Sequence, residues 1–395
     1  MEFELFLKPE RDRSVRQRHP WIFTGAVGRI TGEPESGETL LVRSAAGEAL
    51  GFAAYSPTSK IVARMWNWNP EENIDETFFR RVIRNSIDRR KAFISSFEGR
   101  GTRLIHAESD GLAGVVADRY NDWLSVQFLT AGADRWKEGL VEWLCQESGL
   151  NQVFERSDVE VRKLEGLPER NGVLRGLPTG LVEIEESGLR YFVDLEKGQK
   201  TGFYLDQRLN RMRTRELTSG RRVLNCFCYT GGFSAAALAG GAVEVLSIDS
   251  SAEALSMAVK NVEHNGFGGD HIRWQEADVF MALRKLRDQN QKFDAIILDP
   301  PKFAPTAAQA VRAARGYKDI NLLAFKLLNP GGLLFTFSCS GGISAELFQK
   351  IIAGAALDAG VEAGIIENLS QSPDHPVALN FPEGAYLKGL VCQVR

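Results

Sequence analysis

The stretch from Arg222 to Ser251 constrains the fold more than any other part of this 395-residue chain. It contains an apolar strand over 223–227, a Tyr-Thr-Gly-Gly turn, an alanine-rich helix over 233–239, and a second apolar strand over 243–248 that stops at Asp249. A strand, a glycine turn, a helix and a strand with a terminal acid form a nucleotide-binding βαβ unit. The sequence therefore predicts an α/β class fold with a Rossmann-like domain.

The turn itself narrows the choice of ligand. It reads C-Y-T-G-G-F-S and lacks the G-x-G-x-x-G pattern of a dinucleotide site. A looser turn with aromatic residues suits S-adenosylmethionine (SAM), which has a ribose and an adenine but no phosphate, so SAM is favoured over NAD. We expect Gly231 and Gly232 to let the backbone approach this ligand, and Asp249 to bind both ribose hydroxyls. A βαβ crossover without a ligand is the alternative.

Two further acids are predicted at the ends of neighbouring strands. Asp278 follows a strand over 272–275 and is placed to accept the exocyclic amine of adenine. Asp299 ends the next strand and begins the sequence Asp-Pro-Pro-Lys-Phe, in which two prolines fix an extended turn. Since parallel strands place their carboxyl ends at one edge of the sheet, Asp249, Asp278 and Asp299 should share that edge.

Cys339 is the candidate nucleophile. It ends a fifth strand, and Gly341-Gly342 and a new helix follow it. A thiol beside a helix N-terminus can ionise more easily, and addition of a thiolate at C6 of a pyrimidine makes C5 nucleophilic enough to accept a methyl group. Asp299 would assist the addition near N3. A small buried thiol in a core strand is the competing interpretation.

Upstream of this domain, the chain divides into two smaller predicted regions. Residues 1–70 contain short strands broken by Gly or Pro, which indicates a β-barrel-like domain, and residues 71–190 read as an α+β middle domain with a helix over 75–97. Within the first region, Arg16, Arg18 and Trp21 form an arginine cluster beside an aromatic residue, which suits RNA. A solvated loop is the alternative for this cluster. The third domain then covers 191–395.

Composition is ordinary and limits the class of protein only broadly. The net charge of −3 argues against a protein that coats nucleic acid but leaves room for a local basic face. Five cysteines show no metal-site spacing, and Cys226 and Cys228 are interpreted as core residues inside one strand. No signal region and no apolar run near 20 residues is found, so we expect a cytoplasmic protein with no membrane association and no metal.

Six motifs together resemble one known family. They are HPWIF (19–23), EKGQKTGFYLDQR (196–208), NCFCYTGGFS (225–234), DPPKF (299–303), SCSGG (338–342) and HPVALNFPEGAYLKGL (375–390). The chain resembles the PUA-domain-containing, SAM-dependent RNA methyltransferases that make 5-methylcytosine in large-subunit ribosomal RNA. The resemblance implies a PUA domain, a middle domain and a class I methyltransferase domain, with Cys339 as nucleophile, Asp299 on the base, and Asp249 and Asp278 on the cofactor. Many other RNA 5-methylcytosine enzymes have a second cysteine where this chain has Pro301.

These arguments give a full set of predicted site residues. The cofactor set, in which an aromatic-rich segment over 203–208 covers the bound molecule, is Phe203, Gln207, Arg208, Phe227, Tyr229, Thr230, Gly231, Gly232, Asp249, Ser250, Asp278, Val279, Asp299 and Pro300. The RNA set is Arg16, Arg18, Trp21, Lys200, Lys302 and Phe303. Methylation of uracil C5 or of a base amine, and a non-catalytic SAM- and RNA-binding assembly protein, remain as alternative functions. The oligomeric state is open, with a homodimer as one candidate.

Overall fold

The chain forms two compact units, each assembled from separate segments. The computed structural model describes residues 3–94, 100–177, 180–303 and 309–395. Unit 1 comprises residues 1–185, 193–205 and 373–384, and unit 2 comprises residues 186–192, 206–372 and 385–395. A short segment near the C-terminus therefore belongs to unit 1, although the predicted third domain would include it.

Unit 1 begins with a six-stranded sheet. Its strand order is β2-β6-β5-β4-β1-β3, with only β1 and β4 parallel among the pairs along this order. The strands are β1 (Glu4–Leu7), β2 (Trp21–Phe23), β3 (Val27–Thr31), β4 (Thr39–Arg43), β5 (Ala49–Tyr55) and β6 (Ile61–Asn67), with the short helix α1 (Arg13–Arg16) between β1 and β2. Buried aliphatic residues such as Leu5, Leu40 and Val42 give this sheet a core of its own.

The second part of unit 1 has a five-stranded sheet and a separate core. The strand order is β11-β10-β9-β8-β7. The elements are α2 (Glu76–Ile94), β7 (Gly101–His106), β8 (Val115–Tyr120), β9 (Trp123–Phe128), α3 (Ala131–Arg135), α4 (Lys137–Ser148), β10 (Gln152–Ser157), α5 (Val161–Leu164) and β11 (Arg170–Arg175). Phe79 of α2 stacks on Trp143 of α4, with 5.5 Å between ring centroids. The predicted helix over 75–97 is thus observed as far as Ile94, and its last part lies outside the described residues.

The arginines of α2 are paired with carboxylates from other elements. Arg80 and Arg84 donate to Glu147, and Arg89 and Arg90 to Asp110. Although these four arginines share only two carboxylates, each is held in an ion pair, so the structure gives them a structural role.

Residues 373–384, which we call the C-terminal strap, pack within unit 1 against segments far away in sequence. Phe381 lies 4.9 Å, centroid to centroid, from Trp21, and the Asn380 side chain donates to the Arg18 carbonyl. Asp374, which is fully buried, accepts a hydrogen bond from the Arg103 backbone at 3.1 Å. The HPWIF motif and the closing motif therefore form one packed structure.

Unit 2 is built on a seven-stranded sheet with the order β16-β15-β14-β17-β18-β20-β19. The first five strands of this order are parallel, and β20 is antiparallel to both of its neighbours. The strands are β14 (Arg222–Cys226), β15 (Glu244–Asp249), β16 (Ile272–Glu276), β17 (Phe293–Leu298), β18 (Leu328–Ser338), β19 (Ala363–Ser370) and β20 (Lys388–Val394). A hairpin of β12 (Leu181–Glu186) and β13 (Leu189–Asp194) precedes them.

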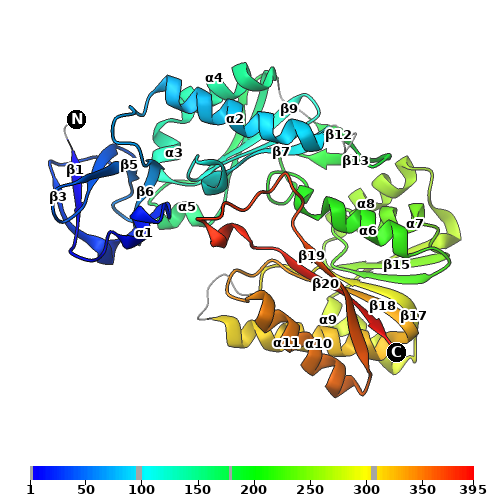
Figure 1. The fold of residues 1–395 in the computed structure, drawn as a ribbon. Helices are drawn as coiled ribbons and strands as arrows, with labels where there is room; N and C mark the ends of the chain where they lie inside the picture. Colours follow the sequence, from blue (N-terminus) through cyan, green and yellow to red (C-terminus); the bar gives the residue numbers. More distant parts are fainter. Residues whose placement is uncertain (1–2, 95–99, 178–179, 304–308) are drawn as a thin grey trace. The chain divides into compact units, whose positions relative to one another are not determined.

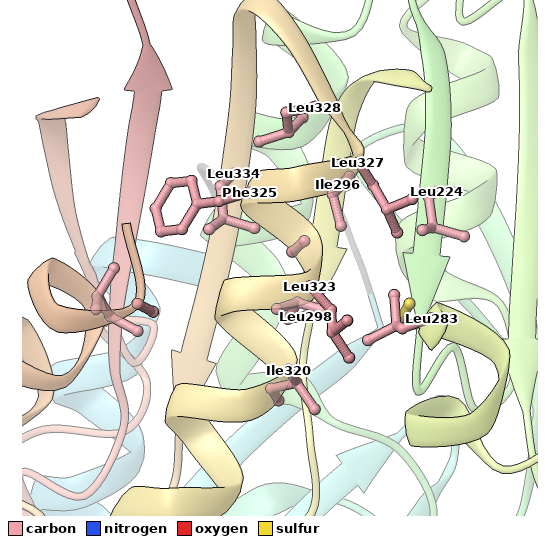
Figure 2. Close-up of a cluster of buried hydrophobic side chains, with 14 of the residues drawn as sticks. Leu224, Leu283, Ile296, Leu298, Ile320, Leu323, Phe325, Leu327, Leu328 and Leu334 are labelled. Carbon is pink, nitrogen blue, oxygen red and sulfur yellow. The ribbon is translucent and has the colours of Figure 1, made fainter. Parts of the chain in front are cut away.

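Helices cover both faces of this sheet, as Figure 1 shows: α6, α7 and α8 form one layer, and α9, α10 and α11 form the other. Their bounds are α6 (Arg208–Leu217), α7 (Gly232–Ala239), α8 (Ala252–His264), α9 (Val279–Asp288), α10 (Ala310–Leu327) and α11 (Ala345–Ala359). Figure 2 shows the core beneath the second layer, where Leu224, Ile296 and Leu298 of the sheet meet Leu283, Ile320 and Leu323 of the helices. The predicted Rossmann-like α/β domain is confirmed.

Two strands end earlier in the structure than the sequence predicts. Cys228 was expected inside the first strand, but β14 ends at Cys226 because Phe227 has a positive φ of 59°, which no strand residue adopts. Both cysteines are buried, as expected for core residues. Likewise β18 ends at Ser338, so Cys339 is the first residue beyond the strand.

Within the described ranges, no helix is both long enough and apolar enough to cross a membrane. The same residues contain no cluster of three or more His, Cys, Asp or Glu side chains arranged to bind a metal ion.

Candidate active site

The predicted acids and the thiol lie along one edge of the unit 2 sheet. Asp249 is the last residue of β15, and its predecessor Ile248 pairs in register with Cys226 of β14. Cys226 also pairs with Leu298 of β17, so Asp299 lies one residue beyond the level of Cys226 in the sheet. On the next strand Leu298 pairs with Thr336, which places Cys339 three residues further along. Parallel pairing thus brings the carboxyl ends of β15, β17 and β18 together.

The turn after β14 is held in a conformation that few residues adopt. Phe227, Tyr229 and Gly231 all have positive φ angles, of 59°, 48° and 80°. For residues other than glycine this conformation is strained, and such strain is concentrated at functional sites. The Asp249 carboxylate supports the turn: it accepts hydrogen bonds from the Tyr229 backbone N–H at 2.8 Å and from the Ser251 N–H at 3.0 Å. Asp249 therefore has a structural role in addition to its predicted contact with ribose.

The structure gives a second reason for glycine at position 231. A Cβ atom at this position would lie 2.9 Å from the Cβ of Ala258 on α8, and the positive φ angle independently favours glycine. Close packing of the turn against α8 thus favours glycine here, and approach of the backbone to the ligand stays a prediction. Gly232, which the prediction grouped with it, is the first residue of α7 and is buried.

Asp278 lies where it was predicted, and it also caps a helix. Its side chain accepts a hydrogen bond from the Met281 N–H at 3.0 Å, and it is the N-cap of α9. The side chain is exposed, whereas its neighbour Val279 is buried. Ser250, at the end of β15, is exposed.

A hydrogen-bonded triad flanks the Cys339 position on both sides in sequence. The Tyr317 hydroxyl on α10 lies 2.9 Å from Ser338 Oγ and 3.0 Å from Ser340 Oγ, and all three residues are buried. Burial raises the pKa of the Tyr317 phenol, and the charges of Cys339 and Asp299 raise it further. Tyr317 thus lies within electrostatic range of both predicted catalytic groups, although no sequence motif singled it out.

Exposure separates Cys339 from the other four cysteines. All five lie within the described residues; Cys339 has intermediate exposure and the other four are buried. Burial raises the pKa of the Cys392 thiol to about 12, and the pKa values of Cys145, Cys226 and Cys228 are raised for the same reason. Since the thiolate is the nucleophile, these four thiols are inert by comparison.

Known proteins share this arrangement over the whole chain. Residues 168–390 match the model of the S-adenosylmethionine-dependent methyltransferases, and residues 5–68 match a PUA-like domain. The chain belongs to the SAM-dependent methyltransferase family. A protein from Shewanella amazonensis named ribosomal RNA large subunit methyltransferase I is 50% identical over 395 residues, covering 100% of both chains. A protein of the same name from Tolumonas auensis is 49% identical and covers 99% of both.

Solved structures show the same fold for this methyltransferase. A SAM-dependent methyltransferase structure from Streptococcus mutans has a TM-score of 0.85 at 22% identity and covers 99% of this chain and 100% of its own. A methyltransferase structure in complex with SAH has a TM-score of 0.87 at 22% identity, with the same coverage. The two family models identify the N-terminal sheet as PUA-like and SAM as the cofactor.

The residues around the turn fit a SAM molecule. The Thr230 hydroxyl is buried, and among the described residues it has no hydrogen-bond partner. The Asn225 side chain donates to Ser234 Oγ at 2.8 Å, but its buried carbonyl oxygen has no partner within the same described part of the chain. Such groups are costly unless they are satisfied. With Asp249 and Asp278, they would bind the polar groups of SAM, which supplies an electrophilic methyl group when bound.

Three predicted cofactor residues upstream of the sheet are buried. Phe203 lies in unit 1, where its backbone N–H lies 3.1 Å from the Tyr120 hydroxyl. Gln207 and Arg208 lie in unit 2; Gln207 accepts a hydrogen bond from Asn210, and Arg208 contacts Glu186 at 3.4 Å. Contact of these three residues with SAM remains a prediction.

The predicted RNA residues lie in both units. Trp21 is half-buried, packs against Phe381 and donates its indole N–H to Glu108 at 2.9 Å, so the structure gives it a packing role. Arg16 is exposed and pairs with Asp12 and Glu48. Arg18 is exposed with a φ of 62°.

The other three lie in two of the quoted motifs, residues 196–208 and 299–303. The Lys200 ammonium lies 4.2 Å from the centroid of the Tyr204 ring in unit 1. In unit 2, Lys302 is exposed, and the Phe303 ring lies 4.8 Å from the Tyr317 ring and follows buried Pro300 by three residues. The structure places Phe303 and Lys302 beside the candidate catalytic edge.

Proposed function

We propose that this methyltransferase transfers a methyl group from SAM to C5 of a cytosine in large-subunit ribosomal RNA. The relatives that are 48–50% identical over nearly their whole length carry the name ribosomal RNA large subunit methyltransferase I, which supports the RNA substrate. The motif resemblance supports cytosine C5 as the target atom.

The observation that carries this proposal is the position of Cys339. It is the cysteine with partial exposure, it directly follows a parallel strand, and it lies at the sheet edge that also carries Asp249 and Asp299. A methyltransferase acting on a base amine has no use for a thiol at this place. Methylation of a pyrimidine carbon does, because C5 is a poor nucleophile until C6 has been attacked.

The residues then have the following roles. The Cys339 thiolate forms a bond to C6. The electron pair of the C5–C6 double bond then forms a C4–C5 double bond, and the pair of the C4–N3 double bond moves onto N3, where Asp299 would donate a hydrogen bond or proton. SAM, when bound at the turn after β14, would supply the electrophilic methyl group that the activated C5 accepts. Removal of the C5 proton by a base re-forms the C5–C6 double bond and expels the Cys339 thiolate.

RNA must present the cytosine outside its stack, at a cost of about a few kcal/mol. Lys302 and Phe303 flank the proposed catalytic edge and would contact the displaced base or its phosphates, with Lys200 and Arg18 as further phosphate contacts from unit 1. Since ribosomal RNA is the proposed substrate, we expect the enzyme to act in the cytoplasm.

The test uses RNA containing 5-fluorocytosine. Its C5 carries fluorine in place of the proton that a base must remove, so the covalent adduct cannot be released. Wild-type protein with SAM should form a covalent RNA adduct seen as a gel shift, Cys339→Ala should form none, and Cys392→Ala should behave as wild type because that thiol is buried in β20. An adduct that persists in Cys339→Ala would refute the nucleophile. Nucleoside mass spectrometry after incubation with ribosomal RNA and SAM should detect 5-methylcytosine; 5-methyluridine or a methylated purine would instead establish another target atom.

A further inference from the structure

Lys388 connects the C-terminal strand of unit 2 to the turn that carries Cys339. It is the first residue of β20, and in the antiparallel pairing it lies opposite Ser338, the residue just before Cys339. Its ammonium donates to the carbonyl of Ser340 at 2.8 Å and to the carbonyl of Ile343 at 2.7 Å. These two carbonyls bracket the Gly341-Gly342 turn, so a single ammonium closes the loop that follows the thiol.

The loop is thereby fixed from two directions. Tyr317 binds the side chains of Ser338 and Ser340 from α10, and Lys388 binds the backbone from β20. The Ile343 side chain is buried in the core, and Ser344 caps α11 by accepting a hydrogen bond from the Leu347 N–H at 3.1 Å. A nucleophile reacts efficiently only when it is held close to its target atom, and these hydrogen bonds hold the loop that follows Cys339.

The Lys388 ammonium also acts on the charge of the thiol. Lys388 is half-buried; burial lowers its pKa, negative charge on Cys339 raises it, and the nearby Lys302 lowers it. Interaction between two charges is reciprocal, so the ammonium that is favoured by the thiolate also favours the thiolate. Among the described residues, the Tyr317 phenol on α10 also interacts with the charges of Cys339 and Asp299.

Resting on the proposed function, we propose that Lys388 is the positioning residue of the nucleophile: it anchors the Ser340–Ile343 turn and stabilises the thiolate form of Cys339. Its role goes beyond that of a lysine that merely begins a strand, because its hydrogen bonds hold the turn after Cys339 and its charge acts on the Cys339 thiol.

Alkylation of Cys339 as a function of pH tests this role without RNA. Iodoacetamide should modify Cys339 first, because the other cysteines are buried, and peptide mass spectrometry can follow this residue alone. In Lys388→Met the rate at neutral pH should fall about tenfold, which corresponds to a thiol that ionises about one pH unit higher. Lys388→Arg keeps the charge and should retain most of the wild-type rate. Lys350→Met is the matched control, since Lys350 pairs with Glu346 on the exposed face of α11.

The proposal is overturned if the pH profile of Lys388→Met coincides with that of wild type while SAM binding and the thermal unfolding curve are unchanged. If Lys388→Met does not fold, Lys388→Gln decides the question, because its amide still donates to one carbonyl but carries no charge; a wild-type profile in that variant has the same consequence. With RNA, the variant should lose kcat at unchanged affinity for SAM. Absence of methylated RNA from the wild-type protein would refute the proposed function alone, since the alkylation profile is measured independently of it.

Discussion

Replacing Gly231 by alanine should destabilise unit 2 through two separate effects. A left-handed backbone costs an ordinary L-residue about 1–2 kcal/mol, and Gly231 has a φ of 80°. The new Cβ would also lie 2.9 Å from Ala258 Cβ. Both residues are buried, so neither can move away easily. Overpacking of this kind costs about 1–3 kcal/mol. Together these effects predict a loss of about 2–5 kcal/mol.

Gly266→Ala is the matched control for this substitution. Gly266 has a similar φ of 77° at the end of α8, but an added Cβ would have no atom within 4 Å. It should therefore cost only the backbone term of about 1–2 kcal/mol. Hydrogen exchange measured by mass spectrometry on peptides from β14, α7 and α8 reports the opening free energy of unit 2 separately from that of unit 1.

Equal losses in the two variants would refute the packing argument, because they would leave only the backbone term. SAM binding by calorimetry separates this explanation from the ligand-approach interpretation of Gly231. If the glycine exists to admit the ligand, Gly231→Ala should lose affinity for SAM with protection of α8 unchanged. If it exists to admit α8, protection of α8 should fall first.

Three further predictions concern single side chains. Asp249→Asn replaces one of two oxygens that accept backbone N–H groups, so SAM affinity should fall at least about tenfold by calorimetry, as loss of a charged hydrogen bond is worth about 1.5–3 kcal/mol; unchanged affinity would contradict the role of the turn. Phe381→Ala should cost about 3–5 kcal/mol in exchange protection of the C-terminal strap, whereas Leu379→Ala, at a fully exposed position, should cost almost nothing. Hydrogen bonds from Arg84 hold the pKa of the Glu147 carboxyl below its ordinary value, so its stabilisation is present above the unfolded pKa and is lost as pH falls through the folded one. Glu147→Gln should therefore lower the urea midpoint at neutral pH, with the gap to wild type closing in acid; a gap independent of pH would contradict this assignment.

Much of unit 2 could be predicted from local patterns. Short apolar runs located β14, β15, β16 and β17 within one or two residues, and an acid marks the end of β15, β16 and β17. Topology then required Asp249 and Asp299 to share an edge, because parallel strands present their carboxyl ends together. The predicted carboxyl-end acids are observed there.

Other parts of the site depend on residues distant in sequence. The end of β14 at Cys226 is set by the left-handed conformation of Phe227, which the apolar run did not reveal. Trp21, predicted as a stacking surface for RNA, packs against Phe381, and a pattern within residues 8–21 cannot show a partner 360 residues away. Tyr317 lies in none of the six motifs, and Lys388 lies in the closing motif without a role that the sequence could assign, since each is defined by the loop that it binds.

The sequence by itself determined the fold class of unit 2, the acids at its sheet edge, and the thiol that follows β18, because hydrophobic period and strand-ending residues are local properties. Only the tertiary structure decided what holds those groups in place. Gly231 is required by α8, Asp249 supports the turn that it follows, and the loop of Cys339 is fixed by α10 and β20. Such contacts join residues that are separated by tens of positions, and their energies arise only when the chain has packed.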